Sequence, residues 1–169
     1  EYAVMGIKMA TEEINAAGGV MGRQLDVMSE DSVNPQVAST KAQRMIERDG
    51  VAVLMGEINS ASALTISQVA GRSKKLFMSI GARSDVLRGK NCNRYTFHVD
   101  IPVTVMVNAA GYALVREGLV KGKKIYSLTA DYLFGHDLLS VAKAFFAANG
   151  GTLLGDELVA TDATDFSPF

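Results

Sequence analysis

The sequence has very few of the side chains on which most catalytic and metal chemistry depends. Its 169 residues include one cysteine, Cys92, two histidines and no tryptophan. A single cysteine excludes an internal disulfide framework and any zinc site built from several cysteines. Two histidines leave little for a metal centre or for histidine-based catalysis, so we expect no metal and no other cofactor.

The sequence also has no large excess of positive or negative charge. The 17 Lys and Arg residues nearly balance the 18 Asp and Glu residues, which gives a formal net charge of −1. Without a strong basic field, nucleic acid and anionic membrane are poor candidates for the main partner. No apolar run approaches the roughly 20 residues that span a bilayer, so we do not expect a membrane-embedded protein.

The sequence does have the composition of a globular protein, with 48% hydrophobic residues and only three prolines. Apolar residues at steps of three and four predict helices at 2–17, 34–49, 60–70, 102–118 and 135–148, with another beginning near Thr164. Strand patterns fall at 24–31, 51–55, 76–80, 95–99, 125–129 and 152–159. Strand 51–55 is apolar on both faces, which predicts a buried parallel strand. The alternation predicts an α/β fold with doubly wound parallel sheets.

Sequence signatures of common enzymes are absent. There is no phosphate-binding loop, dinucleotide-binding fingerprint, nucleophile elbow or zinc-protease motif. His136 and Asp137 follow Gly135 at the start of a helix, where we interpret them as a polar first turn. The protein is therefore not expected to be an enzyme.

In sheets of this kind, ligands bind beyond the carboxyl ends of the strands, which directs attention to three turns. The first turn follows strand 51–55 and contains Ile58, Asn59 and Ser60. Free N–H groups and a serine hydroxyl at a helix N-terminus would form an anion site. The alternative is that Ser60 or Ser62 only caps its own helix.

The second turn follows strand 76–80 and contains Gly81, Ala82, Arg83 and Ser84. Glycine lets the backbone approach a ligand, and arginine offers a planar fork of donors that suits a carboxylate. The alternative for Arg83 is a solvated side chain or an ion pair with Asp85.

The third turn follows strand 125–129 and contains Tyr132 and Phe134. Aromatic side chains at such a position belong either to the core or to the ligand site. Both interpretations stay open for this turn.

Several segments, in chain order, resemble type I periplasmic solute-binding proteins, the leucine/isoleucine/valine-binding protein family of ABC importers. The resemblance rests on Glu12–Leu25, Asp31 with Asn34-Pro35 and Ala38, Val53–Gly56 with Ser60, Phe77–Ala82, Ala130–Gly135 and Thr164–Ser167. It implies two α/β lobes with the ligand clamped between them. Residues 1–118 would form most of the first lobe and residues 119–169 the start of the second. The family's first strand would precede Glu1, and most of its second lobe would follow Phe169.

The resemblance also implies roles for individual residues. Ser60 matches the serine that holds the ligand's carboxylate, and Ile58 matches a neighbouring backbone contact. Gly81 and Arg83 match the pair that grips the head group, and Phe134 matches an aromatic residue of the second lobe. Arg83 departs from the small hydroxyl residue common at its position, and this favours an aromatic or aliphatic acid over a branched-chain amino acid.

We therefore expect a periplasmic or lipid-anchored extracytoplasmic receptor that delivers a small carboxylate-bearing ligand to a membrane ABC permease. The ligand site would include Ile58, Asn59, Ser60, Gly81, Ala82, Arg83, Ser84, Tyr132 and Phe134. The alternatives are a ligand-sensing domain of a receptor or regulator on the same fold, and a flavodoxin-like enzyme.

Overall fold

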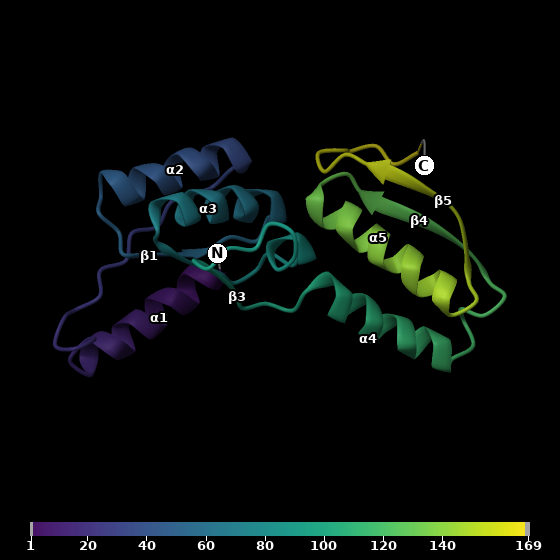
Figure 1. The fold of residues 1–169 in the computed structure, drawn as a ribbon, viewed down its shortest axis with the longest axis horizontal. Helices are drawn as coiled ribbons and strands as arrows, with labels where there is room; N and C mark the ends of the chain where they lie inside the picture. The colour runs from purple at the N-terminus through teal and green to yellow at the C-terminus, as the bar shows by residue number, and fades with distance from the viewer. Residues whose placement is uncertain (1, 168–169) are drawn as a thin grey trace.

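The computed structural model describes residues 2–167, which form two small parallel sheets flanked by helices (Figure 1). The helices are α1 (Tyr2–Ala16), α2 (Pro35–Glu47), α3 (Ser60–Ser73), α4 (Val103–Arg116) and α5 (Leu133–Ala148), with a short 3-10 helix, η1, at Asp85–Leu87. The strands are β1 (Val53–Gly56), β2 (Leu76–Ser79), β3 (Thr96–His98), β4 (Lys124–Ala130) and β5 (Thr152–Val159). The predicted α/β class with parallel sheets is confirmed.

The first sheet has the order β1-β2-β3, with all pairs parallel. Helices α2 and α3 lie together beside it (Figure 1). Leu54 and Phe77, which are partners in the β1–β2 register, point into the core with Ala63 and Val69 of α3. We call the sheet with α2 and α3 the first sheet unit.

Strand β1 is buried on one face only, whereas its sequence predicts burial on both. Val53 and Met55 are 43% and 48% exposed, while Leu54 between them is 6% exposed. Helix α1 is drawn on the opposite side of β1 from α2 and α3 (Figure 1), but none of the residues Tyr2–Ala16 is buried. No element within residues 2–167 therefore covers the second face of β1.

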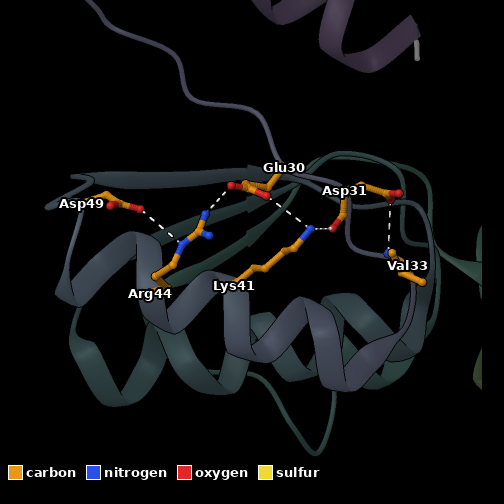
Figure 2. A network of polar contacts seen from close by, with 6 residues as sticks. All are labelled: Glu30, Asp31, Val33, Lys41, Arg44 and Asp49. Carbon is orange, nitrogen blue, oxygen red and sulfur yellow. Dashed lines mark hydrogen bonds and ion pairs between the residues drawn. The ribbon is translucent and has the colours of Figure 1, made fainter.

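Residues 24–31 do not form the predicted strand. The segment is extended but pairs with no strand in the described chain. Side chains attach it to α2 instead: Glu30 lies between Arg44 and Lys41, and Lys41 Nζ also donates to the Asp31 carbonyl oxygen at 2.6 Å (Figure 2). Alternating apolar residues indicate an extended conformation, but a strand also requires a neighbouring backbone.

The second sheet pairs β4 with β5 in parallel, and α5 packs against both strands. Helix α4 packs against α5, where Tyr112 meets Phe145 edge to face at a centroid distance of 5.2 Å. We call β4, β5, α4 and α5 the second sheet unit. The predicted lobe boundary at 118 would assign α4 to the first lobe, and this boundary stays a prediction.

The predicted last helix, beginning near Thr164, is not seen among the described residues, where 164–167 form no helix. Asp165 Oδ1 accepts a hydrogen bond from Ser167 N at 2.9 Å, and the rest of the predicted helix lies outside the described residues. No helix within residues 2–167 is long and apolar enough to cross a membrane.

Acid should release the 24–31 segment from α2. The pKa of Glu30 lies below its ordinary value of 4.5 because Arg44, and then Lys41, donate hydrogen bonds to its carboxylate. A carboxylate whose pKa is lower in the folded state than in the unfolded state stabilises the fold at pH values above its unfolded-state pKa. This stabilisation is lost as the pH falls through the folded-state pKa. We expect the segment to become more mobile below a pH of about 4.5, as measured by NMR relaxation of its backbone amides, and Glu30→Gln to show this mobility already at neutral pH.

The control is Glu12→Gln, which changes an exposed carboxylate of α1. Equal acid sensitivity in the Glu30→Gln variant and the wild type would show that Glu30 does not attach the segment.

Gly135→Ala should destabilise the second sheet unit. A Cβ atom at Gly135 would lie 1.9 Å from the carbonyl oxygen of Ala130, so α5 can begin this close to β4 only because the residue is glycine. We expect a loss of about 1–3 kcal/mol or more, measured by thermal unfolding. The matched control is Gly6→Ala in α1, where nothing lies within 4 Å of the added atom. If both variants unfold like the wild type, the close approach is not a constraint.

Candidate ligand-binding site

A cleft of about 350 Å³ lies at the carboxyl ends of the strands, between the two sheet units. The loops after β1, β2 and β3 contribute one side, and the loop after β4 with the start of α5 contributes the other. The lining residues are Ala3, Ile58, Ile80, Gly81, Arg83, Asp100, Tyr132 and Phe134. Five of the predicted site residues line the cleft: Ile58, Gly81, Arg83, Tyr132 and Phe134.

The N-terminus of α3 is capped by Asn59, not by Ser60 or Ser62. Asn59 Oδ1 accepts hydrogen bonds from the backbone N–H groups of Ala61 and Ser62, at 2.9 and 3.1 Å. Glu57 Oε1 accepts from the N–H groups of Ile58 and Asn59, at 2.9 and 2.7 Å. The chain itself therefore supplies acceptors for these four N–H groups, at the turn that the sequence offered as an anion site.

Ser60 lies behind the cleft and supports the loop after β2. It is 1% exposed, and its Oγ accepts from the backbone N–H groups of Arg83 and Ser84, both at 3.3 Å. We call residues 81–86 the Arg83 turn. Ala82 and Ser84 of this turn are fully buried, so with Ser60 they lie behind the lining residues, whereas the capping residue Asn59 is exposed.

Gly81 allows the Arg83 turn to lie against the loop after β1. A Cβ atom at this position would come within 3.0 Å of the Ile58 side chain and 3.2 Å of the Glu57 carbonyl oxygen. The absence of a side chain therefore brings the two loops together at the floor of the cleft.

Arg83 pairs with Asp100, not with Asp85 as one interpretation of the sequence proposed. Arg83 Nε donates to Asp100 Oδ2 at 2.9 Å, with the side chains 43% and 20% exposed. Partial burial acts to raise the pKa of Asp100, but the hydrogen bonds from Arg83 and from Ile101 N hold that pKa below its usual range. Asp100 is therefore ionised at neutral pH, and it orients the guanidinium through Nε. Within residues 2–167, the hydrogen bond from Nε is the one that fixes this side chain, and the Nη groups stay available as donors.

The opposite wall is aromatic. The rings of Tyr132 and Phe134 lie with centroids 5.9 Å apart, at the end of β4 and the beginning of α5. Their position in the cleft favours the interpretation as site residues over that as core residues. The lining residues described here include no Ser, Thr, Cys or His that could act as a nucleophile or proton carrier. Residues 2–167 also contain no cluster of three or more metal-ligating side chains.

Three lining residues were not identified by the sequence analysis: Ala3, Ile80 and Asp100. The signal for Asp100 was present, because a carboxylate directly follows strand 95–99 and that strand ends at the same edge of the sheet. Asp137, interpreted as part of a polar first turn, reaches across to the Arg83 turn, where its Oδ2 accepts from Ser84 Oγ at 3.0 Å. Nothing in the sequence pairs residues 84 and 137, which lie 53 positions apart.

A known protein family has this architecture. Residues 2–169 match a family model described as periplasmic binding protein, and the chain belongs to this family. Solved structures of the family have the same fold, and the predicted type I periplasmic-binding-protein architecture is confirmed. The family and these structural neighbours are solute-binding proteins.

Three relatives illustrate the similarity. A periplasmic binding protein from Burkholderia mallei is 36% identical, with a TM-score of 0.90 over 98% of this chain and 43% of its own. An ABC-transporter solute-binding protein from Rhodopseudomonas palustris BisB5, in complex with 3,4-dihydroxy benzoic acid, is 25% identical, with a TM-score of 0.80 over 99% of this chain and 46% of its own. Leu/Ile/Val-binding protein homolog 8 from Brucella abortus is 30% identical over 100 residues, 59% of this chain and 25% of the relative. The chain thus spans about a quarter of the curated relatives that it matches.

Ser60→Ala should loosen the Arg83 turn, because the N–H groups of Arg83 and Ser84 would lose their acceptor. A neutral hydrogen bond contributes about 0.5–1.5 kcal/mol, so we expect exchange of these two amides to accelerate several-fold. The control is Ser140→Ala, at an exposed position of α5. Unchanged exchange at both amides would show that the 3.3 Å contacts contribute little to the turn.

Proposed function

We propose that this chain forms the ligand cleft of an extracytoplasmic solute receptor. The receptor captures a small carboxylate-bearing molecule, an organic or aromatic acid or an amino acid, and delivers it to an ABC permease. The protein acts in the periplasm, free or lipid-anchored, and makes or breaks no covalent bond. Direct contacts come from Ile58, Gly81, Arg83, Tyr132 and Phe134, while Ser60, Ala82 and Ser84 lie buried behind them and Asn59 caps α3.

The observation that carries the proposal is the position of Arg83. Its guanidinium is held by Asp100 through Nε at the edge of the cleft, facing a site otherwise lined mainly by apolar and aromatic side chains. An arginine fixed in this way presents its remaining N–H groups in one plane, the geometry that binds a carboxylate with two parallel hydrogen bonds. The aromatic pair would then cover an apolar body attached to that carboxylate.

The relatives support the ligand class. A 25%-identical solute-binding protein is in complex with an aromatic acid, and a 30%-identical relative is named for leucine, isoleucine and valine. All of these molecules carry a carboxylate. The Arg83–Asp100 pair has no net charge, and its cation suits a carboxylate at one end of the ligand.

We further propose that the two sheet units belong to two lobes that close around the ligand. Closure is a shift in population that follows from tighter binding in the closed form. The exposed face of the second sheet, where Tyr126, Leu128 and Leu154 are each about 60% exposed, is consistent with further chain that completes the second lobe.

Arg83→Ala should weaken binding of benzoate in the full-length gene product by about 2–5 kcal/mol, since an ion pair that is buried on closure would be lost. Arg83→Lys should restore only part of the affinity, because an ammonium group cannot form the two parallel hydrogen bonds. Isothermal titration calorimetry with benzoate, benzamide and leucine measures these effects. The matched control is Arg72→Ala, which removes an exposed arginine from the last turn of α3.

Benzamide has the shape of benzoate without its charge, so it should bind the wild type poorly and lose little more in Arg83→Ala. If the variant discriminates benzoate from benzamide as well as the wild type does, Arg83 does not bind the carboxylate. If leucine alone binds, the ligand is an amino acid. If none of a panel of carboxylates binds the wild type, the proposed function is wrong.

A further inference from the structure

Asp137 connects the two sheet units at a single oxygen atom. It lies in the second turn of α5, and its Oδ2 accepts hydrogen bonds from Ser84 Oγ at 3.0 Å and from Asp85 N at 2.6 Å. Both donors belong to the Arg83 turn, which follows β2 of the first sheet unit: Ser84 precedes η1, and Asp85 is the first residue of η1. Ser84 is completely buried, so its hydroxyl has no bulk water as an alternative partner while this contact is made.

The loop that Asp137 contacts is the same one that carries Arg83. Its backbone is also held by Ser60 of α3, which accepts from Arg83 N and Ser84 N. At its other end, Asp85 Oδ2 accepts from the backbone N–H of Thr104 at the start of α4, at 2.9 Å. The carbonyl oxygen of Arg83 also accepts from the N–H of Val103, the first residue of α4, at 2.9 Å. The Arg83 turn is therefore fixed within the first sheet unit by Ser60, and it is joined to α4 through Arg83 and Asp85 and to α5 through Asp137.

Asp137 follows Phe134 by three positions on α5, so the two residues lie about one helical turn apart. A rigid helix transmits the position of Asp137 to the aromatic wall of the cleft. The contact between Asp137 and Ser84 is thus the one that joins α5, which carries Phe134, directly to the turn that carries Arg83.

We propose that Asp137 is a positioning residue that fastens the second sheet unit to the Arg83 turn and thereby sets the width of the ligand cleft. This inference rests on the proposed function only in so far as the cleft binds a carboxylate. A carboxylate suits the task, because its hydrogen bonds to neutral donors are strong and because a partly exposed Asp137 can be solvated when the contact opens. The contact can therefore break and form again as the units move.

The test compares Asp137→Ala with Asp137→Asn in the full-length gene product. One oxygen accepts both hydrogen bonds, so the amide oxygen of asparagine can reproduce the contact, whereas alanine removes it. The matched control is Asp156→Ala, which breaks a 2.8 Å ion pair with Lys143 inside the second sheet unit. Nitroxide labels on the native, exposed Cys92 and on Ala144→Cys in α5 report the distance between the units by electron spin resonance.

Without ligand, we expect the distance distribution to widen in Asp137→Ala, to stay near that of the wild type in Asp137→Asn, and to be unchanged in Asp156→Ala. With benzoate as the probe, Asp137→Ala should bind roughly tenfold more weakly, whereas Asp137→Asn should bind nearly as well as the wild type. A distance distribution in Asp137→Ala equal to that of the wild type would overturn the proposal, as would an equal widening in Asp156→Ala.

The distance measurement needs no ligand. If benzoate and other carboxylates fail to bind the wild type, the proposed function is wrong, and the distance distributions still decide the role of Asp137.

Discussion

The backbone N–H groups of residues 83–86 each need an acceptor, and this constraint determines how the parts of the molecule meet. The chain leaves β2 here, so no neighbouring strand supplies carbonyl groups in a regular ladder. Ser60 accepts from residues 83 and 84, Asp137 from residue 85, and Ser84 Oγ from Val86 N. Because these acceptors come from α3, from α5 and from the turn itself, satisfying one short loop brings together elements far apart in the sequence.

The cleft is a consequence of the same arrangement. Parallel strands end at one edge of a sheet, so the loops after β1, β2 and β3 gather there, and the contact with α5 brings Tyr132 and Phe134 to face them. Asp100, which follows β3, then orients Arg83, the cation among the described lining residues. Hydrogen bonds to the backbone thus position the walls of the cleft, and the Arg83–Asp100 pair lies at the edge of this largely apolar space.

Much of this could be predicted from sequence periodicity, because apolar spacing and capping residues act locally. Asn34-Pro35 begins α2 as predicted, with Asn34 accepting from Val37 N. Predictions that required a partner distant in the sequence were wrong or missing. The alternation in 24–31 could not show that no neighbouring strand lies beside it, and Arg83 has two acidic candidates nearby, of which the structure selects Asp100. The sequence around Asp137 indicates only a residue near the start of a helix. Its contact with Ser84 forms only when both sheet units are folded.

The side chains of Glu57 and Asn59 accept hydrogen bonds from N–H groups before and within the first turn of α3. These hydrogen bonds affect how such a site can change during evolution. When backbone amides bind an anion, the charge preference depends on the fold more than on any one side chain. Here those amides are already bonded within the chain, so under the proposed function the preference for a carboxylate depends on the side chains of Arg83 and Asp100. A change in one codon, at position 83 or 100, would then alter what the cleft accepts while the backbone stays as it is.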